Sequence, residues 1–170
     1  MDFQGLLVAI AKILDKLKIP YAVTGGFAAS FWGKPRSTLD IDIVIEVLEP
    51  KVAVLKKTLQ EEFKLGYVDA GRKSFNFIDG ESGIKVDFFI KDKLWQRKSV
   101  NIEGQRVYFI SPEDLILSKL LWQKETGSEQ QLRDIAGIFE ISGDKLDLDY
   151  LKKQAKKLGV DEALKKCHGR

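Results

Sequence analysis

The chain has 170 residues, 44% hydrophobic and 31% charged, which is the composition of a globular protein of one ordinary domain, or of one domain with a small helical appendage. Its formal net charge of only +3 argues against a nucleic-acid-binding protein, and no run of about 18 apolar residues supports a membrane span or a membrane partner. The single Cys167 excludes a disulfide framework or a cysteine metal site within one chain, so we expect a reducing, cytoplasmic location.

The N-terminal half alternates helical and strand patterns. Its predicted elements are, in order, a helix over 3–18, a strand over 21–26 that ends in a glycine pair, a short helix over 27–33, a strand over 39–48 and a helix over 52–66.

The second half begins with strands and ends with helices. Its predicted elements are a hairpin over 74–90 with its turn at 79–83, a strand over 105–110, a helix over 111–123, a helix over 128–141 and one or two helices in the lysine-rich tail. Ser111 as N-cap, Pro112 in the first turn and Asp114 three residues after the cap mark a strong helix start. We therefore expect an α+β fold, with a sheet core over 1–110 and a helical region over 111–170 packed on it.

Two aspartates interrupt the most strand-like segment of the chain. Asp40 and Asp42 share one face of the predicted strand, roughly 6.5–7 Å apart at Cα, while Ile41 and Ile43 share the other. The pair is either the solvated face of an edge strand or a site for one cation. Because oxygen ligands without nearby His or Cys suit Mg²⁺ or Mn²⁺, the second interpretation predicts a divalent-metal site and a phosphorylated ligand.

A third carboxylate fits the same site. Asp87 lies opposite the apolar face of its own predicted strand, which holds Val86 and Phe88. If this strand pairs with 39–47, Asp87 joins Asp40 and Asp42 and helps to hold a second metal ion, and two such ions clamp both oxygens of an in-line displacement.

The glycine pair suits a phosphate. Gly25 and Gly26 lie between a strand and a helix, where backbone N–H groups favour an anion and where glycine allows close approach. Arg36 can add a charge-assisted contact. A plain tight turn is the alternative for the glycines.

Gly25-Gly26, the run Asp40-Ile41-Asp42 and the later strand residue Asp87 together resemble the nucleotidyltransferase superfamily of the DNA polymerase β type. The run 36–42, with Arg36 and Thr38 ahead of the aspartates, is most similar to the minimal nucleotidyltransferase-like toxins of abortive-infection systems. The resemblance implies a mixed central sheet of the nucleotidyltransferase type, flanked by helices and followed by a helical block.

The resemblance also implies roles for two later helices. Lys119 would face the nucleotide phosphates, and Asp134, which follows Arg133, would support that lysine or the acceptor. Without the resemblance, Lys119 reads as a solvated position on an amphipathic helix, and Arg133 with Asp134 as an exposed ion pair.

What the resemblance implies as activity is transfer of a nucleoside monophosphate from an NTP to a hydroxyl-type acceptor, with release of pyrophosphate. The implied metal ligands for Mg²⁺ or Mn²⁺ are Asp40, Asp42 and Asp87, the catalytic set adds Lys119, and the nucleotide-binding set is Thr24, Gly25, Gly26, Arg36, Thr38, Lys119 and Asp134.

Two other functions remain open at this point. The first is a non-catalytic protein of the same fold that acts as a partner in a toxin–antitoxin pair, against which the three acids argue. The second is an RNA-binding module, against which the near-neutral charge argues. The acceptor of the enzyme would be a small molecule, tRNA or a protein side chain.

Overall fold

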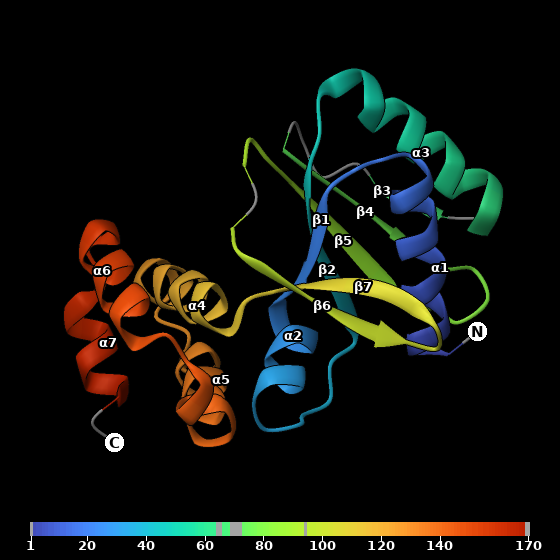
Figure 1. Ribbon diagram of the computed structural model, residues 1–170. Coiled ribbons are helices and arrows are strands. Elements are labelled where there is room, and N and C mark those ends of the chain that lie inside the picture. The colour runs from blue at the N-terminus through green and yellow to red at the C-terminus, as the bar shows by residue number, and fades with distance from the viewer. Residues whose placement is uncertain (1, 64–65, 69–72, 94, 169–170) are drawn as a thin grey trace.

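The computed structural model describes residues 2–63, 66–68, 73–93 and 95–168. Figure 1 shows a central sheet with helices around it and a helical block at one end. The elements are α1 (Phe3–Lys16), β1 (Tyr21–Thr24), α2 (Gly25–Trp32), β2 (Asp40–Glu46), α3 (Glu49–Phe63), β3 (Gly66–Val68), β4 (Ser74–Ile78), β5 (Lys85–Lys91), β6 (Arg97–Ile102), β7 (Gln105–Ile110), α4 (Pro112–Thr126), α5 (Glu129–Ser142), a 3₁₀ turn (Gly143–Lys145), α6 (Leu148–Leu158) and α7 (Asp161–His168).

The sheet is mixed, as expected. Within the described residues it has seven strands in the order β3-β4-β5-β2-β1-β7-β6. The central strand β2 runs parallel to β5 and antiparallel to β1, while β1 is parallel to β7. These pairings confirm the predicted α+β class and place the two aspartate-bearing strands side by side.

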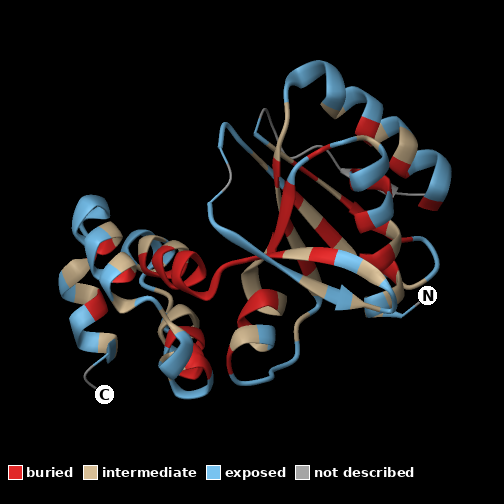
Figure 2. Ribbon diagram, viewed as in Figure 1, coloured by how far each residue is buried: buried red, intermediate tan, exposed pale blue. Residues whose placement is uncertain are grey.

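Alternation along β2 sets which face is buried. Ile41, Ile43 and Ile45 are completely buried, whereas the residues between them are only partly so. On β5, Val86 and Phe88 are buried in the same core. Figure 2 shows this buried stripe running through the sheet, so Asp40 and Asp42, which alternate with buried isoleucines, leave the apolar core intact.

Two strands were not predicted. β6 carries charged and polar residues that are mostly exposed, so it lacks the apolar alternation that reveals a strand. Among the described strands it pairs only with β7. Glu103 and Gly104, which join the two strands, both have positive φ, as a two-residue hairpin requires. β3 is only three residues long.

The helix boundaries also differ from the predictions. β1 ends at Thr24, and the glycine pair forms the first turn of α2 rather than the end of the strand. The helix predicted over 52–66 spans Glu49–Phe63, and residues 64–65 at its expected end lie outside the described part of the chain.

The C-terminal region is helical, as predicted. Ser111 caps α4, its Oγ accepting a hydrogen bond from the Asp114 N–H at 3.2 Å, with Pro112 in the first turn. α2 contacts both β1 and β2 and also α4 and α5, so it connects the sheet to the helical block. In the described residues no helix combines the length and the apolar character needed to span a membrane.

Candidate active site

The acidic residues of β2 and β5 form adjacent rows on one face of the sheet. Asp42 is the register partner of Asp87, and Asp40 is the partner of Lys85. Burial, followed by the negative charges of Asp87 and Asp40, raises the pKa of Asp42 above its ordinary value. The carboxylates therefore repel one another, which is the condition that a bound cation would relieve.

The three carboxylates do not converge on one point in this structure. Among the described residues, no three His, Cys, Asp or Glu side chains converge closely enough to hold a metal ion. Instead, the Lys85 Nζ lies 2.8 Å from the Asp87 Oδ2. An ammonium group thus contacts one of the acids that the sequence assigned to a metal.

Gly25 makes room for the Asp42 carboxylate. A Cβ on Gly25 would lie 1.8 Å from the Asp42 Oδ2, and Gly25 has φ +64°, a conformation that other L residues rarely adopt. The Gly26 N–H donates a hydrogen bond to this carboxylate and thereby opposes the rise in its pKa. The first turn of α2 and the acid of β2 are therefore built against each other.

Gly26 makes room for a second group. A Cβ there would lie 2.7 Å from the Arg36 Nη2 and 3.0 Å from the Thr38 Oγ1. The backbone of Arg36 is held by Ser30, whose Oγ accepts from the Arg36 N–H at 3.2 Å and donates to its carbonyl at 3.1 Å. The guanidinium is thus fixed beside the start of α2, and the glycine pair packs on the chain's own polar side chains.

Asp134 joins two cations from distant parts of the chain. Its Oδ1 accepts from the Arg36 Nε at 2.8 Å, and its Oδ2 accepts from the Arg36 Nη2 at 3.1 Å and from the Lys119 Nζ at 2.8 Å. Gln130 donates to Oδ1 at 2.8 Å, and Gln131 accepts from Lys119 at 3.0 Å. This network connects the loop before β2 with α4 and α5.

The charges of the network do not cancel. Lys119 is 5% exposed and Asp134 7%, so both are removed from water. Burial opposes ionisation of Asp134, but the hydrogen bonds from Arg36 and Lys119 hold its pKa below the ordinary value, while burial lowers the pKa of Lys119. Two cations on one carboxylate leave a net positive charge within this network, which the nearby Asp42 carboxylate partly offsets.

Two of the alternatives from the sequence are wrong. Lys119 is not a solvated position, because α5 and α2 cover its part of α4. Arg133 and Asp134 do not form an exposed ion pair: Asp134 is buried, and Arg133 lies on the surface, where it contacts Gln130 and Glu129. The structure brings all the predicted site residues together around the start of α2. They are Thr24, Gly25, Gly26, Arg36, Thr38, Asp40, Asp42, Asp87, Lys119 and Asp134.

Three residues at the site were missed. Lys85 was detectable, because period two places it on the same face of β5 as Asp87. Gln130 and Gln131 precede Asp134 by one helical turn, but two glutamines on a helix are too common to signal a site.

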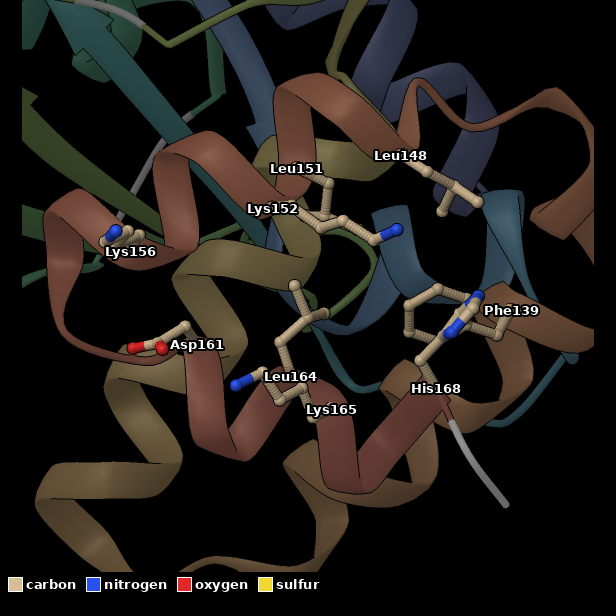
Figure 3. A pocket seen from close by; sticks show the side chains of 9 residues that line it. All are labelled: Phe139, Leu148, Leu151, Lys152, Lys156, Asp161, Leu164, Lys165 and His168. Atoms are coloured by element: carbon tan, nitrogen blue, oxygen red, sulfur yellow. The ribbon is translucent and has the colours of Figure 1, made fainter.

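A hollow of about 320 Å³ lies away from these residues. Figure 3 shows it between α5, α6 and α7, with an apolar floor of leucines and Phe139 and with lysines at its edge. The His168 ring contacts Phe139 at a centroid distance of 5.1 Å. None of the predicted site residues lines this hollow.

Solved structures of similar shape come from nucleotidyltransferases. An antigenic nucleotidyltransferase-like protein from Paracoccidioides brasiliensis has 26% identity and a TM-score of 0.63, over 81% of this chain and 75% of that one. ANT(2'')-Ia in complex with adenylyl-2''-tobramycin has 16% identity and a TM-score of 0.66, over 91% and 97%. The lincomycin-bound lincosamide antibiotic adenylyltransferase LnuA has 17% identity and a TM-score of 0.56, over 83% and 98%.

The sequence itself matches no curated protein. It does match one family model over residues 3–165, which is nearly the whole chain. The resemblance to nucleotidyltransferases that the sequence motifs indicated is thereby confirmed, and the chain belongs to the family described as nucleotidyltransferases of unknown function (DUF6036).

Proposed function

We propose that this protein transfers a nucleoside monophosphate from an NTP to an acceptor hydroxyl in a reaction that depends on Mg²⁺ or Mn²⁺. The observation that carries the proposal is the charge pattern at the start of α2. Gly25 packs against Asp42, the register partner of Asp87, and Gly26 packs against Arg36, which Asp134 links to Lys119. A metal–triphosphate complex carries the complementary charges.

The residues present suit a hard divalent cation. Asp40, Asp42 and Asp87 offer only carboxylate oxygens. Burial and then repulsion from the other two acids raise the pKa of Asp42, and this repulsion favours a cation between them. When bound, the ion would neutralise negative charge on the triphosphate oxygens. These three residues would hold it.

The chain's own groups would orient the reactants. Arg36 and Lys119, held in place by Asp134, supply positive charge that a triphosphate would satisfy. The acceptor oxygen forms a bond to the α-phosphorus, the bond to the bridging oxygen of pyrophosphate breaks, and the acceptor proton passes to the Asp87 carboxylate. Such a reaction depends mainly on positioning and on stabilisation of charge.

The test is incubation with each NTP radiolabelled at the α-phosphate, Mg²⁺ or Mn²⁺, and three acceptor pools: hydroxyl-bearing small molecules, total tRNA and extracted protein. We include small molecules because the neighbours ANT(2'')-Ia and LnuA were solved with adenylyl-2''-tobramycin and lincomycin. We expect label transfer to one pool that disappears in Asp42→Asn. If no pool is labelled and Asp42→Asn still binds a protein partner as the wild type does, the non-catalytic toxin–antitoxin role replaces this proposal.

A further inference from the structure

Lys85 is the single cation in a block of four ionisable side chains on β2 and β5. Asp40 and Asp42 are register partners of Lys85 and Asp87, and all four project from the same face of the sheet. Figure 1 shows the two strands side by side.

The contact between Lys85 and Asp87 is direct but readily broken. Nζ and Oδ2 are 2.8 Å apart, and the Lys85 side chain is 40% exposed while that of Asp87 is 16% exposed. The lysine has a flexible four-carbon stem and reaches water, whereas the carboxylate stays in the sheet. The ammonium can therefore leave Asp87 without any movement of the strand.

The position of the ammonium disfavours binding of a divalent cation to the same carboxylate. A divalent ion on Asp87 would lie within a few ångströms of the Lys85 Nζ, and the repulsion between the two positive charges opposes binding. In the absence of the ion, the lysine partly neutralises the carboxylates, which otherwise repel one another. Lys85 and a metal ion are thus alternative partners for Asp87.

We infer that Lys85 is a built-in counter-ion that occupies Asp87 in the metal-free protein and must leave it before a divalent cation binds. This inference rests on the proposed metal-dependent function. It makes Lys85 a positioning residue whose presence weakens the affinity of the site for the metal alone. Once displaced, the ammonium is free to contact the phosphates that arrive with the metal, so metal and nucleotide would bind better together than separately.

The test is binding of Mn²⁺ alone to the whole chain, measured by the EPR signal of free Mn²⁺, with no nucleotide present. We expect Lys85→Met to lower the Kd for Mn²⁺ by up to about fivefold, and Lys85→Gln to act in the same direction. Lys91→Met is the matched control. Lys91 projects from the same face of β5, but it lies four residues from Asp87, roughly 13 Å along the strand and beyond the screening length of about 8–10 Å, so its loss should change the Kd far less than loss of Lys85 does.

The outcomes separate the inference from the function on which it rests. Tighter binding in both Lys85 variants, abolished when Asp42→Asn is added, supports the inference. Binding by the wild type that is unchanged or weaker in the Lys85 variants overturns it and leaves the metal site standing. If neither the wild type nor the variants bind Mn²⁺, the metal site is wrong, and the inference falls with it.

Discussion

Replacing Asp134 by asparagine should destabilise the protein strongly, although the two side chains have nearly the same size. The substitution keeps the shape of the side chain but removes the negative charge that Arg36 and Lys119 share. Breaking a buried ion pair by removal of one partner costs about 3–5 kcal/mol, because the remaining charge is uncompensated. The Arg36 side chain is 34% exposed and so keeps contact with water, which places the expected loss near the lower limit, at about 3 kcal/mol.

This loss can be measured by thermal and urea unfolding at neutral pH. For a chain of this length, about 2–4 °C are lost per kcal/mol, so Tm should fall by roughly 6–12 °C. Glu140→Gln is the matched control, since it makes the same chemical change on the same helix in an exposed ion pair with Lys34, which is worth at most about 1 kcal/mol.

A double variant tests the physical reason. Adding Lys119→Met to Asp134→Asn removes one of the two uncompensated cations, so the combined loss should be smaller than the sum of the single losses by about 1–3 kcal/mol. The argument would be refuted if Asp134→Asn cost no more than Glu140→Gln, or if the two changes at the network were simply additive.

Three further predictions concern the other side of the site and the start of α4. Gly25→Ala should abolish transfer, because its Cβ would displace the Asp42 carboxylate, and should lower stability by at least about 1–2 kcal/mol, because Gly25 has a left-handed backbone conformation. Gly83→Ala is the control: at φ +72° with open space around it, it should lower the melting temperature but keep activity. Because the pKa of Asp42 is raised in the folded state, its ionised form destabilises the fold, and stability decreases as pH rises from the unfolded pKa through the folded one. Asp42→Asn should therefore raise Tm at neutral pH while abolishing transfer, and a lower Tm would contradict this sign. Ser111→Ala removes the N-cap of α4, so it should lower the free energy of unfolding by about 1 kcal/mol and Tm by about 2–4 °C. Equal melting curves would show that the cap contributes nothing to stability.

Much of the fold was predictable because its signals are local. The alternation along β2 and the cap at Ser111 are each encoded within a few residues, and the structure confirms both. β6 was not predictable in this way, since its residues are mostly exposed and only its pairing with β7 makes it a strand. The start of α2 was predicted two residues late, because the glycine pair packs against Asp42 and Arg36, which are distant in the chain.

The sequence by itself predicted which residues would carry the proposed chemistry. Period two is a property of the backbone, so Asp40 and Asp42 share a face in any fold that makes 39–47 a strand, and the family resemblance added Asp87, Lys119 and Asp134. Only the tertiary structure decided how they meet. Parallel pairing of β2 with β5 places Asp87 opposite Asp42, and the packing of α4 and α5 buries Lys119 against Asp134. Register and helix packing depend on contacts between segments far apart in the chain, which no local pattern records.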